Sequence, residues 1–182
     1  MTIRSAFTYI EIMIVIVILA ILTIAALPDR ESTIQEEGRR ATVVFEADVD
    51  YARSLSIARP DAPIGIKVAI GNNKYWLAPV ATPDTPIAHP RTGQPYVRQF
   101  GATGPDGLKN VQITTLDLGG DDILKFDALG GTDQQTSAVV QFEAGLAAYE
   151  TKVSPAAANV TTTKKETTNS EKLAVQAAKE AQ

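Results

Sequence analysis

The hydrophobic and polar positions divide the chain into stretches with different periods. Phe7 to Leu27 form a nearly unbroken apolar run that contains one ionisable side chain, Glu11, and Pro28 follows it. At about 1.5 Å of rise per residue, this run matches a hydrocarbon core of about 30 Å. The pattern therefore predicts a membrane-spanning helix over residues 7–28, in which Glu11 is the one costly side chain.

Residues 29–59 have the period of an amphipathic helix. Their apolar side chains recur mostly at steps of three or four, and charged residues fill the opposite face. The apolar positions are Ile34, Ala41, Phe45, Val49, Ala52 and Leu55 or Ser56. We expect this segment to continue the first one as a single long helix, bent at Pro28 and weakened at Gly38, that ends before Pro60. Its apolar stripe is expected to pack on a globular domain.

Residues 60–154 show the period-two alternation of strands. The predicted strands are Ile64–Ile70, Lys74–Ala78, Pro95–Phe100, Val111–Leu116, Ile123–Phe126, Ala138–Phe142 and Ala147–Val153. Turn residues at Gly71–Asn73 and Gly145 predict two hairpins. Residues 79–105 are rich in Pro and Gly and are predicted to be mostly loop. The fold class is therefore α+β, a long N-terminal helix packed on antiparallel β-sheets.

Residues 155–182 lack aromatic side chains and contain the low-complexity runs Ala156–Ala158 and Thr161–Thr163. The segment has few large apolar side chains, so it cannot bury enough apolar surface to offset the entropy lost on ordering. The sequence therefore predicts a disordered C-terminal tail.

Composition argues against several classes of function. The net charge of -4 offers no basic surface for nucleic acid. Without cysteine there is no thiolate site, and the single histidine, His89, has no second histidine with which to share a metal. Asp117, Asp121 and Asp122 lack the spacing of a calcium loop and favour a plain turn. No group of nucleophile, base and acid is visible, so we predict a protein that is not an enzyme and has no cofactor or metal.

The first 28 residues resemble the type IV prepilin signal, which is found in type IV pilins and in the pseudopilins of type II secretion. A short leader, Met1–Ala6, carries one arginine and ends in a small residue before the apolar run, the reverse of the order in a secretory signal peptide. The residues that carry the resemblance are Ala6, Phe7, Thr8, Glu11 and Pro28. One departure is Ala6, where the family usually has glycine.

The resemblance implies that a membrane prepilin peptidase cleaves residues 1–6 between Ala6 and Phe7 and then N-methylates Phe7. It implies that Glu11 pairs with the Phe7 amine of a neighbouring subunit. The implied partners are the peptidase, other pilin or pseudopilin subunits, an inner-membrane assembly platform and the lipid bilayer. The implied location is the bacterial inner membrane, with a single pass and a periplasmic C-terminal domain.

Two further runs, Asp50–Arg59 and Phe126–Gly130, resemble the minor pseudopilin H of type II secretion and the related fimbrial T minor pilins. This resemblance implies a structural subunit with a helix packed on two small sheets, placed at the tip of a filament. Two alternatives stay open. One is a major pilin of a surface fibre, and the other is a membrane-anchored binding module that does not polymerise and uses residues 79–105 as its ligand surface.

Overall fold

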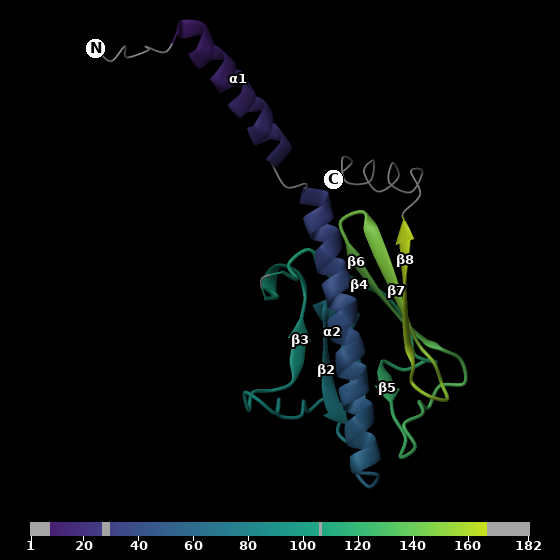
Figure 1. The fold of residues 1–182 in the computed structure, drawn as a ribbon. Coiled ribbons are helices and arrows are strands. Elements are labelled where there is room, and N and C mark those ends of the chain that lie inside the picture. The colour runs from purple at the N-terminus through teal and green to yellow at the C-terminus, as the bar shows by residue number, and fades with distance from the viewer. Residues whose placement is uncertain (1–7, 27–29, 106, 167–182) are drawn as a thin grey trace. The chain divides into compact units, whose positions relative to one another are not determined.

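The computed structural model describes residues 8–26, 30–105 and 107–166 (Figure 1). The chain divides into two units, residues 1–33 and residues 34–182. The first unit contains helix α1, Tyr9–Ala26, and the second contains nearly all of helix α2, Arg30–Ala58, and all the strands. The cleavage residues Ala6 and Phe7, and Pro28, lie outside the described residues.

The prediction of one long N-terminal helix is wrong. The described residues form two separate helices, α1 and α2, instead of a continuous helix from residue 7 to residue 59. The apolar run and the amphipathic run differ in period, and each forms its own helix. The sequence-based prediction joined them because it treated Pro28 as a bend within one helix, although proline can also end a helix.

The predicted single pass through an inner membrane is also contradicted. Neither described helix combines the length and the apolar character that a membrane crossing requires. Helix α1 rises about 27 Å at about 1.5 Å per residue, short of the roughly 30 Å of a hydrocarbon core. Its first turn also contains the polar residues Tyr9 and Glu11, which shortens the fully apolar part further.

Helix α2 buries the stripe that its period predicts. Ala41, Phe45, Val49 and Ala52 are completely buried, whereas Val43 and Glu46 on the outer face are exposed. At its C-terminal end, the Ser56 hydroxyl accepts a hydrogen bond of 2.9 Å from the amide of Ile64, the first residue of the first strand. The stripe fixes which face of α2 meets the sheets, and Ser56 fixes where the following strand begins.

Sheet I has the strand order β3-β2-β1-β5, with every neighbouring pair antiparallel. Its strands are β1 (Ile64–Ala69), β2 (Lys74–Pro79), β3 (Val97–Gln99) and β5 (Ile123–Lys125). The predicted first hairpin is confirmed, with the 3₁₀ turn η1 (Ile70–Asn72) between its strands. Asn73 closes the turn in the left-handed region, at φ 49°, a conformation that asparagine tolerates better than most residues.

Sheet II has the order β4-β6-β7-β8 and is also antiparallel. Its strands are β4 (Val111–Asp117), β6 (Ala138–Ala144), β7 (Ala147–Val153) and β8 (Val160–Glu166), and a second 3₁₀ turn, η2 (Gly101–Thr103), precedes them. The predicted hairpin of β6 and β7 around Gly145 is confirmed.

The prediction of a disordered tail from residue 155 onward is wrong for β8. Val160–Glu166 pair with β7 over its whole length, from Val153↔Val160 to Ala147↔Glu166. The segment consists of Val and Thr followed by Lys and Glu, and β-branched residues suit a strand even when little of their surface is buried. The backbone of β7 supplies the pairing that the side chains of this segment could not supply alone.

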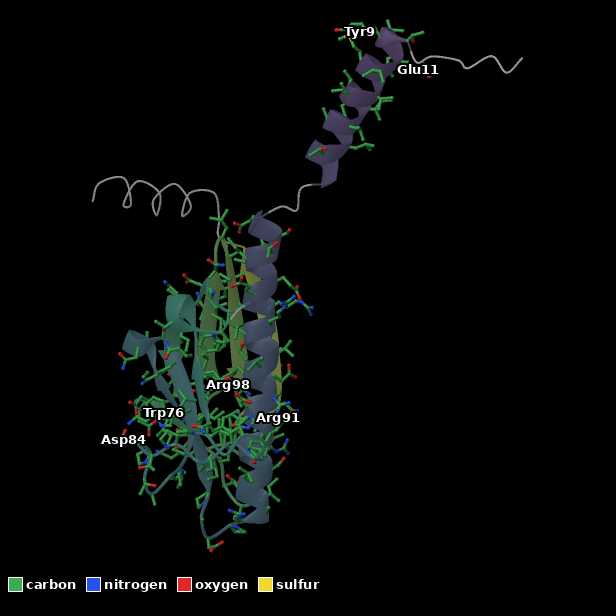
Figure 2. The ribbon with its side chains drawn as sticks, turned by 90° about the vertical axis from the view of Figure 1, so that its left-hand side faces the viewer. Tyr9, Glu11, Trp76, Asp84, Arg91 and Arg98 are labelled. Atoms are coloured by element: carbon green, nitrogen blue, oxygen red, sulfur yellow. The ribbon has the colours of Figure 1, made fainter. Side chains whose placement is uncertain are left out.

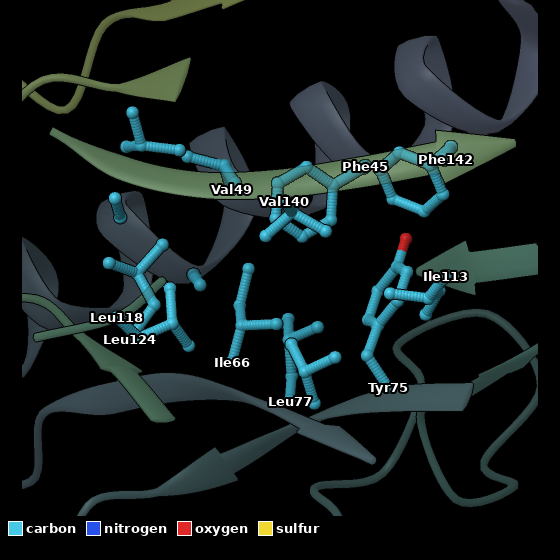
Figure 3. Packing of buried hydrophobic residues seen from close by; sticks show 14 of the residues in the cluster. Phe45, Val49, Ile66, Tyr75, Leu77, Ile113, Leu118, Leu124, Val140 and Phe142 are labelled. Carbon is cyan, nitrogen blue, oxygen red and sulfur yellow. The ribbon is translucent and has the colours of Figure 1, made fainter. Parts of the chain in front are cut away.

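One aromatic cluster joins α2 to both sheets (Figure 3). The Phe45 ring lies 5.3 Å from that of Tyr75 in sheet I and 5.5 Å from that of Phe142 in sheet II, measured between ring centroids. Phe100 completes the cluster with contacts to Tyr75 and Phe142. A single helix residue therefore anchors α2 to both sheets, which gives residues 34–166 one shared core.

Gly38 allows α2 to approach sheet II closely. A Cβ atom at this position would lie 2.6 Å from Cε2 of Tyr149, closer than two carbon atoms can pack. The Tyr149 hydroxyl donates a 2.8 Å hydrogen bond to the carbonyl of Gln35, one turn earlier in the helix. The glycine that the sequence suggested as a weak point in the helix is thus the contact point between α2 and β7.

Candidate functional site

Helix α1 exposes apolar side chains around its entire circumference. Between Tyr9, at 82% exposure, and Leu22, at 57%, consecutive apolar residues have about half or more of their surface exposed. Consecutive residues of a helix point in different directions, so no single face can account for this pattern. A helix that is apolar on all sides is normally buried, so the apolar surface of α1 must be covered by other groups.

Glu11 lies in the first turn of α1, and Figure 2 shows it there together with Tyr9. Its amide donates to the Thr8 hydroxyl at 3.4 Å, and the Thr8 amide donates to the Glu11 carboxylate at 3.5 Å. These reciprocal bonds form a capping box, in which Thr8 is the N-cap residue. The carboxylate also lies at the positive end of the helix dipole. Glu11 is therefore a local cap as well as the one acid of the apolar run.

A second polar cluster lies at the junction of α2 and sheet I. The carboxylate of Asp48, which is 2% exposed, accepts four hydrogen bonds. The Tyr75 and Tyr96 hydroxyls donate at 2.9 and 2.7 Å, and the Arg98 guanidinium donates from Nε at 2.8 Å and from Nη2 at 3.1 Å. The donors come from β2, from the residue before β3 and from β3 itself. Asp48 thus holds one side of sheet I against the helix.

The three side chains that donate to Asp48 have raised pKa values. The hydrogen bond to Asp48 raises the pKa of Arg98 above its usual value, so the guanidinium stays charged. Burial, followed by the hydrogen bond to Asp48, raises the pKa of Tyr96 to about 12. Burial also raises the pKa of Tyr75 well above its usual value. Both phenols are therefore held as neutral donors to the carboxylate.

These phenols predict a loss of stability at alkaline pH. In the unfolded chain a tyrosine titrates near pH 10, whereas folded Tyr96 keeps its proton to about pH 12. Because the unfolded state loses its protons first, the free energy of unfolding should fall as the pH rises through this range. Urea titrations at about pH 9 and about pH 11, followed by the fluorescence of Trp76, measure the loss. Between these two pH values, the free energy of unfolding should fall less for Tyr96→Phe than for the wild type. An equal fall would contradict the raised pKa of Tyr96 as its cause.

The segment between β2 and β3 is held by side chains along its length. The Trp76 indole donates to the carbonyl of Pro83 at 2.8 Å, and Lys67 pairs with Asp84 at 2.8 Å. The His89 ring stacks on Tyr96 at 4.6 Å between centroids. Figure 2 shows Trp76, Asp84 and Arg98 on the same side of the domain. The segment that the sequence suggested as a ligand surface is anchored to sheet I and to the Asp48 cluster.

No metal site is found in residues 8–26, 30–105 and 107–166, because no three His, Asp or Glu side chains there are grouped as ligands. In the acidic turn after β4, Asp121 pairs with Lys125 at 2.6 Å and Asp122 with Lys67 at 3.6 Å. These carboxylates take part in salt bridges, as a plain surface turn would allow.

Of the four site residues predicted from the sequence, Ala6, Phe7, Glu11 and Pro28, only Glu11 lies in the described part of the chain. The structure brings it together with Thr8, a contact that was not predicted from the sequence and that the T-x-x-E spacing of a capping box could have indicated. The Asp48 cluster had no comparable signal, because its members lie far apart in the sequence. Comparisons with protein-family models, with curated proteins and with solved structures find no match. Function is therefore inferred from the residues of this chain and their geometry.

Proposed function

We propose that this chain is a structural subunit of a type IV pilin-like filament, of the minor pseudopilin or minor pilin kind, that assembles through α1. The observation that carries the proposal is α1 itself, which exposes apolar side chains on every side and has one carboxylate in its first turn. The prepilin-like residues around the start of this helix support the same conclusion.

The free energy available from covering α1 is large. Complete burial of one Val, Leu, Ile or Met side chain contributes about 1.5–3 kcal/mol. The exposed residues that could contribute are Ile10, Ile12, Met13, Ile14, Val15, Ile16, Val17, Ile18, Leu19, Ile21 and Leu22. Copies of α1 from neighbouring subunits offer the matching apolar surface, and several neighbours together cover all sides of one helix.

The second unit has the properties expected of the globular part of such a subunit. Helix α2 packs on two antiparallel sheets through one shared core, so the described residues from 34 to 166 belong to one compact unit. Its outer face carries Val43, Glu46 and Asp50, all exposed. In the proposed subunit, this compact domain supplies the surface contacts and α1 supplies the polymerising element.

The leader provides the most direct test of the proposal. Mass spectrometry of the mature protein should find a chain that begins at Phe7 and carries one added methyl group on its amine. Ala6→Leu, which replaces the small residue before the cut with a bulky one, should leave the leader attached. Ala6→Gly, the matched control, should be processed. An intact Met1 terminus in cells with an active prepilin peptidase would overturn the proposal.

Abundance separates the minor subunit from the major pilin of a surface fibre. A minor subunit should be a small fraction of the protein in sheared filaments, whereas a major pilin should dominate it. Recovery of the processed chain outside any filament fraction would instead favour the binding module that does not polymerise.

A further inference from the structure

The two sheets have four edges, and three of them are short or capped. Strands β3 and β5, at the edges of sheet I, have three residues each. At the β4 edge of sheet II, the Asn73 side chain bonds to the backbone like another strand. Its Nδ2 donates to the Val111 carbonyl at 2.9 Å, and its Oδ1 accepts from the Ile113 amide at 2.8 Å. Short or covered edges are how proteins prevent unwanted strand pairing.

The fourth edge, β8, is long and open within the described residues. It has seven residues, and those from Thr161 to Lys165 are exposed. Figure 1 shows β8 at the edge of the sheet, beside β7. Lysines often guard such edges, but here Lys165 pairs with Glu150 and Lys164 donates to the Gln35 side chain at 3.1 Å. Both lysines are thus engaged with their own chain. Among the described residues no strand pairs with the outer side of β8, so its backbone groups there can serve as a template for another strand.

We propose that β8 pairs antiparallel with β8 of a second copy of this chain, in a register centred on Thr163. The two copies would then form one continuous sheet across a two-fold axis, with the same patch used by both. The facing pairs are Val160 with Glu166, Thr161 with Lys165, Thr162 with Lys164, and Thr163 with itself.

Charge selects this arrangement. In the antiparallel register each lysine faces a threonine, and no like charges are directly opposite. In a parallel, in-register pair Lys164 and Lys165 would each face their own copy, which is destabilising. The Val and Thr residues that form the rest of the strand have high β-propensity. The sequence of β8 is therefore suited to pairing with itself in only one of the two directions.

The pairing is independent of the proposed function and distinct from a filament contact. Figure 1 shows β8 running along the length of α2 in the same unit. Antiparallel pairing of β8 therefore reverses α2 in one of the two copies, whereas subunits of a polar filament point the same way. The β8 pair is a separate, closed dimer that a filament would have to open.

Cysteine cross-linking tests the register directly, because the chain has no native cysteine. In full-length protein kept in mild detergent to shield α1, Thr163→Cys places two thiols on residues that face each other. Cα atoms of facing antiparallel residues lie about 4.5–5.5 Å apart, within the range of a disulfide. On mild oxidation, Thr163→Cys should form disulfide dimers at least about tenfold faster than Thr114→Cys, an exposed control on β4.

Mixed variants test the direction of the pairing. Thr161→Cys and Lys165→Cys should cross-link to each other faster than either does to itself. Thr163→Lys and Thr163→Glu should each abolish the dimer alone, because like charges would face each other, and should restore it when mixed. Cross-linking of Thr163→Cys no faster than Thr114→Cys would overturn the proposal, and so would preferential cross-linking of Lys165→Cys to itself.

Discussion

Asp48→Ala is expected to lower the free energy of unfolding by about 3 kcal/mol, the lower end of the usual cost of removing one partner from a buried ion pair, because solvent reaches part of the Arg98 side chain. The variant leaves the Arg98 guanidinium, which is 34% exposed, without its carboxylate and deprives two buried phenols of their acceptor. Small domains are stable by only about 5–15 kcal/mol, so the loss is a large fraction of the total. Urea unfolding followed by the fluorescence of Trp76 measures this loss of stability. Trp76 is the single tryptophan and directly follows Tyr75, a member of the cluster.

Asp50→Ala is the matched control for this prediction. Asp50 lies two residues away on the same helix, but its side chain is exposed, so its loss should change stability by at most about 0.5 kcal/mol. A double variant, Asp48→Leu with Arg98→Met, removes both charges and should recover part of the stability that Asp48→Ala loses. If Asp48→Ala and Asp50→Ala cost the same, Asp48 does not hold sheet I to α2.

Local patterns predicted most of the second unit. The apolar stripe of α2 identified Ala41, Phe45, Val49 and Ala52 as its buried face, and turn residues located the two hairpins. These features depend on residues close together in the sequence, where spacing alone fixes the geometry. The same reasoning applied to β8 failed, because an edge strand gains its order from the backbone of its neighbour and needs few apolar side chains.

Long-range polar contacts could not be predicted in the same way. Asp48 lies three residues after Phe45 and four before Ala52, so the helical period places it on the buried stripe, but nothing in the spacing identifies its partners. Its partners Tyr75, Tyr96 and Arg98 are brought to it only when sheet I folds onto α2. The length of the N-terminal helix was overestimated for a different reason, since Pro28 was treated as a bend and proline can also end a helix.

Glu11→Ala is expected to reduce incorporation of the chain into filaments by about tenfold or more, if α1 is the polymerising element. Apolar contacts between copies of α1 have no preferred axial position, because one apolar side chain covers another equally well at many offsets. Under the proposed function, one charge pair per helix, between Glu11 and the Phe7 amine of a neighbour, would select a single offset. Loss of the Glu11 carboxylate would leave that amine unpaired among apolar side chains. A cost of only about 1.4 kcal/mol already lowers the association constant about tenfold.

The capping contact between Glu11 and Thr8 requires a variant that separates the two roles of this carboxylate. Glu11→Gln keeps the cap, since glutamine serves equally at this position of a capping box, but removes the charge. Thr8→Ala does the reverse. The fraction of processed chain recovered in sheared filaments, by immunoblot, measures assembly for each variant. If the charge sets the offset, Glu11→Gln should fail like Glu11→Ala and Thr8→Ala should assemble. Assembly of Glu11→Gln at the wild-type level, with failure of Thr8→Ala, would show that Glu11 acts only as a helix cap.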